Sequence, residues 1–171
     1  MSVVYVMSDL HLTQPSVIKF RSQFPSHIEH DELIIDNILT ICKKRDTLWL
    51  LGDCFIFPES IKLLAKMKQH IGYIHLVLGN HDTDRERYKN IVLPIINQSL
   101  VDSVHGVHKM KGKAWMTHTP MHPQELYGKI NIHGHVHSNT IPDDRYCNVS
   151  CENTDYKPVK LQDIYGGWRY I

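Results

Sequence analysis

Residues 3–11 read Val-Val-Tyr-Val-Met-Ser-Asp-Leu-His, an apolar run that gives way to polar residues. Its first five residues are all apolar and mostly β-branched or aromatic, which is typical of a strand buried on both faces. Polar side chains follow at once, beginning at Ser8. The stretch therefore predicts a buried strand that delivers polar groups at its carboxyl end.

Two further buried strands are predicted, each after a helix. Apolar residues recur at helical spacing from residue 29 to 42, and again in the segment that follows Pro58. The strands are expected at 47–51, before Gly52 and Asp53, and at 73–78, before residues 79–82. This strand–helix–strand–helix–strand order predicts parallel pairing with right-handed crossovers.

The second half of the chain is richer in strand candidates. They lie at 101–107, 113–116, 130–132 and 146–149, and a short helix is expected at 161–165. These strands predict a second, more antiparallel sheet. No linker, internal repeat or low-complexity stretch divides the sequence, so we expect one α/β domain over residues 1–171.

Composition indicates a globular protein with an unusual number of histidines. Of the 171 residues, 42% are hydrophobic and 22% are charged, close to the globular average. The net charge of +1 gives no overall basic field of the kind that marks many nucleic-acid binders. The 13 histidines are scattered, and histidine is the commonest metal ligand. Composition alone therefore suggests metal binding.

The cysteines and the lengths of the apolar stretches indicate the cellular compartment. The four cysteines form no Cys-x-x-Cys pair, so we interpret them as free thiols in a reducing compartment. The apolar run at 3–7 is too short for a signal peptide, and no stretch has the length of a membrane span. We expect a cytoplasmic protein with no membrane partner.

Polar clusters with metal-ligand chemistry follow the predicted strands. Because the carboxyl ends of parallel strands gather at one edge of a sheet, these clusters should converge. Carboxylate, amide and imidazole groups suit borderline divalent metals, and the absence of thiolate disfavours a structural zinc site. The set is too large for one tetrahedral ion but fits two ions that share a carboxylate. Its members are Asp9, His11, Asp53, Asn80, His81, Asp82, His118, His135 and His137.

The order of these motifs resembles the calcineurin-like metallophosphoesterases. The blocks are Asp-x-His at 9–11, Gly-Asp at 52–53, Gly-Asn-His-Asp at 79–82, a histidine at 118 and Gly-His-x-His at 134–137. The segments 20–33, 146–150 and 153–159 are similar to small single-domain bacterial and phage phosphoesterases of that superfamily. The resemblance implies a four-layer α/β/β/α sandwich with a mixed sheet pair.

The resemblance also implies a role for each residue. Asp9, His11 and His137 would hold one metal ion, Asn80, His118 and His135 would hold the second, and Asp53 would bridge both. His81 would face the substrate phosphate as general acid or phosphate ligand, with Asp82 orienting its ring. Asn80 would also contact the substrate. Arginine suits phosphate through its planar fork, so Arg21 and Arg85 are further candidates for substrate binding.

The predicted function is hydrolysis of phosphate monoesters or diesters with two divalent ions. We expect Mn²⁺, although the same ligands accept Fe, Ni, Co or Zn. One alternative is a nuclease acting on DNA or RNA ends, which would need a basic groove. Another is a non-catalytic scaffold of the same fold, which would require eroded ligands, whereas all seven ligands and His81 are present.

Overall fold

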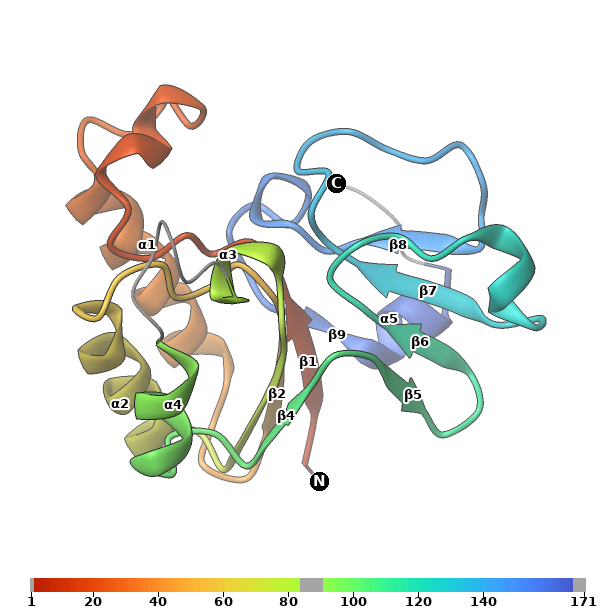
Figure 1. Ribbon diagram of the computed structural model, residues 1–171, viewed down its shortest axis with the longest axis horizontal. Coiled ribbons are helices and arrows are strands. Elements are labelled where there is room, and N and C mark those ends of the chain that lie inside the picture. The colour runs from red at the N-terminus through yellow and green to blue at the C-terminus, as the bar shows by residue number, and fades with distance from the viewer. Residues whose placement is uncertain (1, 84–90, 168–171) are drawn as a thin grey trace.

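Two mixed β-sheets stack against each other in the computed structural model, which describes residues 2–83 and 91–167 (Figure 1). The first sheet has the strand order β4-β3-β2-β1-β9 and the second has the order β5-β6-β7-β8. Helices α1 (His27–Ile41), α2 (Ser60–His70) and α4 (Val92–Asn97) lie on the outer side of the first sheet. The fold is therefore α/β, as the sequence predicts.

The first sheet contains the three strands predicted from the front of the chain. β1 (Val4–Met7), β2 (Thr47–Leu51) and β3 (Tyr73–Val77) pair in parallel, which confirms the parallel prediction. β4 (Ser103–His105) lies within the strand predicted at 101–107 for the second sheet, but it pairs in parallel with β3 in the first sheet. The two-residue strand β9 (Val159–Lys160) pairs antiparallel with β1 at the edge. The residues that follow β1, β2 and β3 consequently share one edge of the sheet.

Alternation along the central strands β1 and β2 explains why they are almost wholly apolar. Tyr5, Met7 and Leu50 pack in one core cluster with Ile34 and Ile38 of α1. The intervening residues belong to a second cluster between the two sheets. That cluster includes Val6, Trp49, Leu51 and Val77 from the first sheet, and Ala114, Met116, Ile132 and Cys147 from the second. Both faces of the first sheet are thus buried.

The second sheet is less antiparallel than predicted. It consists of β5 (His108–Met110), β6 (Ala114–Met116), β7 (Ile130–His133) and β8 (Tyr146–Asn148). Only β5 and β6 pair antiparallel, whereas β6–β7 and β7–β8 are parallel. The reason is connection length: a short turn joins β5 to β6, but long segments precede β7 and β8 and allow the chain to cross back. Strands β5 and β9 and helix α4 were not predicted from the sequence.

Shorter helices complete the described residues. They are η1 (Pro15–Lys19), α3 (Asn80–Thr83), η2 (Pro123–Leu126), η3 (Cys151–Asn153) and α5 (Leu161–Tyr165), which packs against β1 and β9. The four cysteines are buried. Among the helices formed by 2–83 and 91–167, none combines the length and apolar character needed to cross a bilayer.

The core against α1 offers a direct test of the packing. Ile38 is fully buried, whereas Ile28 on the same helix is 58% exposed. Ile38→Ala is expected to lower the free energy of unfolding by about 2–5 kcal/mol, because it leaves a cavity between α1 and the first sheet. Urea denaturation of Ile38→Ala and of the matched control Ile28→Ala measures the difference. Equal losses in the two variants would show that α1 does not pack as described.

Candidate metal centre

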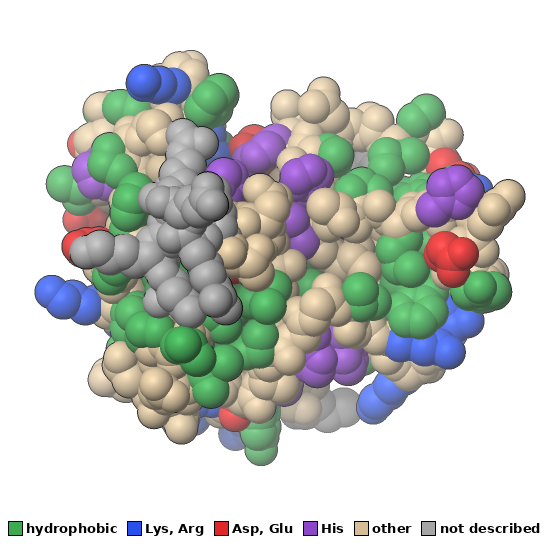
Figure 2. Space-filling view, viewed as in Figure 1, with side chains coloured by type: hydrophobic (Ala, Val, Ile, Leu, Met, Phe, Trp, Pro, Cys, Tyr) green, Lys and Arg blue, Asp and Glu red, His purple; other side chains and the backbone are tan. Residues whose placement is uncertain are grey.

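The predicted ligands gather between the helix-covered first sheet and the second sheet, where Figure 2 shows histidine side chains grouped at the surface. Two groups form, and within each group the ligand atoms all lie within 4.8 Å of one another. The first group is Asp9, His11 and His137, and the second is Asp53, His118 and His135. Each group draws side chains from the ends of both sheets.

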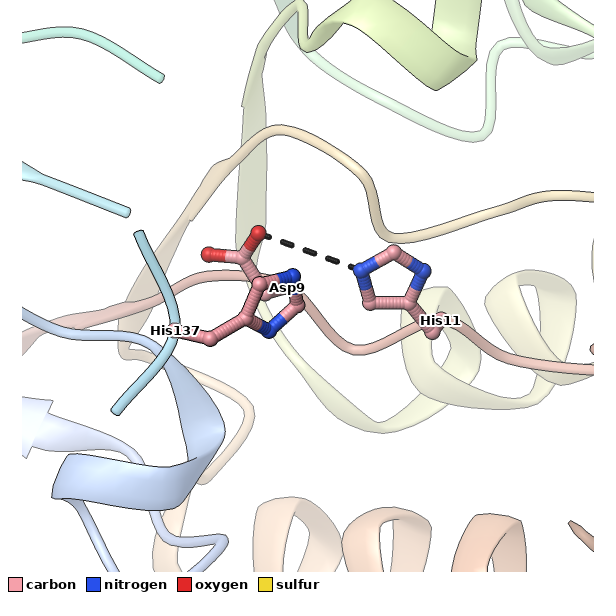
Figure 3. Close-up of side chains that lie close together, drawn as sticks. All are labelled: Asp9, His11 and His137. Atoms are coloured by element: carbon pink, nitrogen blue, oxygen red, sulfur yellow. Dashed lines mark ion pairs between the residues drawn. The ribbon is translucent and has the colours of Figure 1, made fainter. Parts of the chain in front are cut away.

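In the first group, two buried ligand atoms have no hydrogen-bond partner. Asp9 and His11 follow β1, and His137 follows β7 (Figure 3). Asp9 Oδ1 lies 3.9 Å from His11 Nε2, and both atoms are buried without a hydrogen bond. Buried polar atoms are costly unless they are paired or bind a ligand. This arrangement fits a divalent cation.

The other atoms of these side chains are fixed. Asp9 Oδ2 accepts hydrogen bonds from the backbone N–H of His135 and from Ser150 Oγ, both at 2.9 Å. His11 Nδ1 lies 2.7 Å from Gln14 Oε1. One atom of each side chain is thereby held by the protein, while the other is directed into the group.

In the second group, oxygen and nitrogen ligands converge on His118. Its Nε2 lies 3.2 Å from Asp53 Oδ2, 3.1 Å from Asn80 Oδ1 and 3.2 Å from His135 Nδ1. Its Nδ1 lies 2.9 Å from the carbonyl oxygen of Leu51, which fixes the ring. The structure thus places Asn80 with this group, and two oxygens with two imidazoles suit a borderline divalent metal.

The backbone at the ligands is unusual. Five of them have positive φ in the left-handed region, which non-glycine residues rarely adopt. Such strain tends to persist only where the surroundings enforce it, often at functional sites. These residues are Asp9 (57°), His11 (49°), Asp53 (51°), His135 (71°) and His137 (51°).

Two glycines permit close approach at the same edge. A Cβ at Gly79 would collide with Asp53 Oδ1 and the Asp53 backbone nitrogen, and one at Gly134 would collide with Ser8 Oγ and Asp9 Oδ2. Any larger residue there would displace a ligand carboxylate.

Charge is concentrated around the second group. Burial alone would lower the pKa of His118, but its hydrogen bond to Asp53 and the charges of Asp9 and Asp53 raise it to about 9. Burial opposes ionisation of Asp53, yet the hydrogen bond with His118 leaves the pKa of this carboxyl below its usual value. The carboxylates therefore hold a proton on His118, and a metal would take its place.

Glu152, in η3, is a site residue that the sequence analysis missed. Its Oε1 accepts hydrogen bonds from His137 Nδ1 at 3.0 Å and from Arg21 Nε at 2.8 Å. Burial opposes ionisation, but these partners lower the pKa of Glu152 to about 2. A carboxylate on Nδ1 leaves Nε2 of the imidazole as the ligand atom, an arrangement common around bound metals. No motif indicates Glu152, since it lies outside the polar clusters identified from the sequence.

Arg21, which was predicted to contact substrate, forms part of the cleft wall but is almost fully buried. It is 1% exposed, and its Nη2 donates to the carbonyl oxygen of Asp9 at 2.6 Å. Its Nη1 lies 2.7 Å from Nε2 of the buried His30, whose Nδ1 is 2.8 Å from Asp31 Oδ1. The guanidinium nitrogens of Arg21 thus form hydrogen bonds inside the protein, and they hold the Asp9 backbone and the Glu152 carboxylate in place. Arg85, the other predicted arginine, lies outside the described residues.

Asp82 also differs from its predicted role. Its Oδ2 accepts hydrogen bonds from the backbone N–H groups of Gly79 at 2.7 Å and Asp53 at 3.0 Å, and its Oδ1 is buried without a partner. Asp82 therefore holds the backbone that carries Asp53 and does not orient the ring of His81. Burial raises the pKa of Asp82 to about 6.

His81 stands at the edge of the second group without joining it. Its backbone N–H donates to Asp53 Oδ1 at 2.9 Å, and its ring Nε2 lies 3.8 Å from Asp53 Oδ2. The ring faces that of His11 edge-on, with centroids 5.6 Å apart. The side chain is 27% exposed and lines a cleft of about 620 Å³, together with His11, His137 and Glu152. A ligand in the cleft would meet His81 and the first group.

Comparisons with known proteins give relatives of unassigned function. No protein-family model matches the chain. An uncharacterized protein of Methanocaldococcus jannaschii, MJ1445, is 25% identical over 96% of this chain and 90% of its own length. The gene 66 protein of Mycobacterium phage L5 is 26% identical over 68% of this chain, which spans about half (49%) of the phage protein. The crystal structure of AQ665 from Aquifex aeolicus, a protein of unknown function, superposes with a TM-score of 0.73 at 26% identity, covering 97% of this chain and 99% of that one.

The contact between Glu152 and His137 predicts an effect on metal affinity. Glu152→Gln is expected to weaken metal binding about 10–100-fold, because a neutral amide holds the Nδ1–H of His137 less firmly. Titration of metal-free protein with Mn²⁺ in a calorimeter measures the change, with Glu29→Gln on the exposed first turn of α1 as control. Circular dichroism at the same temperature checks that the fold persists. Equal affinities in the two variants would contradict this role.

Proposed function

We propose that this protein hydrolyses phosphate esters with the help of two divalent metal ions. The observation that carries the proposal is the pair of adjacent ligand groups, one of which contains buried Asp9 Oδ1 and His11 Nε2 without protein partners. The motif resemblance to calcineurin-like metallophosphoesterases supports it. The proposal includes the four-layer α/β/β/α arrangement of that superfamily.

The ligands divide between the two proposed ions. Asp9, His11 and His137 would hold the first, and Asn80, His118 and His135 would hold the second. Asp53, whose carboxylate lies in the second group, would also reach the first ion. The ligand set suits Mn²⁺ and accepts Fe, Ni, Co or Zn. When bound, two such ions offset the negative charge of a phosphate and lower the pKa of an attacking water.

His81 is the residue of this chain proposed to handle a proton. Its side chain reaches the cleft and is not part of either ligand group among the described residues. Hydrolysis leaves an alkoxide that needs a proton, and an imidazole at the mouth of the site can donate one. The backbone N–H of His81 donates a hydrogen bond to the Asp53 carboxylate, which holds the proposed proton donor next to the shared carboxylate.

The activity is tested directly by phosphate release. The metal-free protein is reconstituted with Mn²⁺ and assayed on a phosphomonoester, a phosphodiester and single-stranded DNA and RNA. The proposal expects ester hydrolysis that chelation removes and Mn²⁺ restores. Activity confined to nucleic-acid ends would favour the nuclease alternative. Failure to bind metal would favour the scaffold alternative.

The shared carboxylate predicts a change in metal stoichiometry. Asp53→Asn removes the negative charge that would lie between two cations, so their repulsion is less compensated. Metal content after dialysis and turnover are both expected to collapse, as measured by mass spectrometry of the metals and phosphate release. Asp36→Asn, at an exposed position of α1, serves as control. Two ions per chain and near-normal turnover in Asp53→Asn would rule out the bridging role.

The role of His81 predicts a dependence on the leaving group. His81→Ala is expected to keep metal content near that of the wild type and to lower turnover of alkyl phosphates by about 10²–10⁴-fold. The loss should shrink for nitrophenyl phosphate, whose leaving group needs little help from a proton. An equal loss for both esters would indicate phosphate binding without acid catalysis, and loss of metal would refute the separation of roles.

A further inference from the structure

Phe20 presents an apolar ring at the rim of the cleft. It is 85% exposed, more than any other large apolar side chain of the described residues. It lines the 620 Å³ cleft together with His11, His81 and His137. It belongs to neither core cluster, so packing of the fold does not explain its identity.

The position of Phe20 is fixed by its neighbours. Its backbone N–H donates to the carbonyl oxygen of Val17 at 3.0 Å, as does that of Arg21 at 2.9 Å. Val17 is 4% exposed and Arg21 is 1% exposed, so both side chains anchor the turn at the end of η1. With residues 17 and 21 directed inward, residue 20 is held outward. Phe20 is therefore a preformed feature of the cleft.

The rest of the cleft is polar. Gln14, Ser16, Lys19 and Ser138 line it beside the apolar pair Val17 and Phe20. A second hollow of about 360 Å³, lined in part by Phe20, Ser138 and Tyr156, lies next to it. The ring of Phe20 thus borders open space in both hollows. An aromatic face with hydrogen-bonding groups around it suits a flat heteroaromatic ring, which stacks on the face and bonds through its edge.

We infer that Phe20 is a stacking platform and that the substrate is a small phosphate ester whose alcohol carries a flat heteroaromatic ring, as a mononucleotide does. This inference rests on the proposed function, because it places the phosphate at His11, His81 and His137. The cleft volume matches sites for small ligands, and the net charge of +1 offers little attraction for a long polyanion. The platform thereby sets specificity for the alcohol part of the ester.

Two ligands that differ only in the base measure how much the heteroaromatic ring contributes to binding. Adenosine 5′-monophosphate and ribose 5-phosphate share the sugar and the phosphate, and only the first carries a base. Their dissociation constants are measured by calorimetry for the wild type, Phe20→Ala, Phe20→Leu and Phe20→Tyr. Tyr127→Ala removes an aromatic ring that is 70% exposed but does not line the cleft, and serves as control. Proton NMR of the bound nucleotide reports stacking through upfield shifts of the base protons.

The expected result is a loss of discrimination. In Phe20→Ala and Phe20→Leu the preference for the nucleotide over ribose 5-phosphate should fall by about five- to 150-fold, and the upfield shifts should vanish. Phe20→Tyr and Tyr127→Ala should keep both. An unchanged preference in Phe20→Ala, or equal weakening of both ligands, would overturn the inference. Tighter Phe20-dependent binding of a single-stranded oligonucleotide than of the mononucleotide would overturn the assignment to a small ester.

The same samples separate this inference from the proposed hydrolase. The Mn²⁺-loaded wild type could release phosphate from either ester while Phe20→Ala leaves the preference for the nucleotide unchanged. That result would support the proposed hydrolase and contradict the stacking role of Phe20. If nucleotide binding depends on Phe20 but neither ester releases phosphate, the stacking role is supported and the proposed hydrolase activity is contradicted.

Discussion

A single carboxylate oxygen, Asp9 Oδ2, connects the two sheets at the edge where the site forms. It accepts hydrogen bonds from the backbone of His135, which follows β7, and from the hydroxyl of Ser150, which follows β8. Asp9 itself follows β1 in the other sheet. This contact holds His135 and His137 next to the ligands of the first sheet, together with the backbone hydrogen bond from Ser8 to Val149 at 3.0 Å. Position 134 requires glycine, because a Cβ there would overlap Asp9 Oδ2.

Much of this edge could be predicted from the sequence, because each strand and the polar residues after it are adjacent in the chain. A short apolar run followed by a polar cluster identifies a buried strand and its end, and parallel strands bring their ends together. The proximity of Asp9 and Asp53 follows from that rule, whereas the place of His137 beside Asp9 was implied by the motif resemblance. The short strands β5 and β9 escaped prediction because two or three residues carry too little periodicity to be distinguished from a loop.

The parts that could not be predicted depend on long-range contacts. Glu152 reaches His137 only because β8 and η3 fold back across the site, and Arg21 reaches Glu152 from the segment before α1. The motif resemblance implied that Asp82, next to His81 in the sequence, orients the His81 ring. The short helix α3 instead directs its carboxylate to backbone N–H groups. Adjacent positions on a helix do not share a face, so the implied contact does not form.

Each ligand group draws on both halves of the chain, and this has a consequence for how the protein is made. Asp9, His11 and Asp53 emerge from the ribosome early, on a sheet whose inner face, including Val6 and Trp49, still lacks its cover. Chains grow from the N-terminus and fold progressively as they are synthesised. The first group cannot close until residue 137 has been added, and the second cannot close until residue 135 has been added. A nascent chain halted before β7 therefore carries two of the three ligands of each group and an apolar sheet face that is only partly covered.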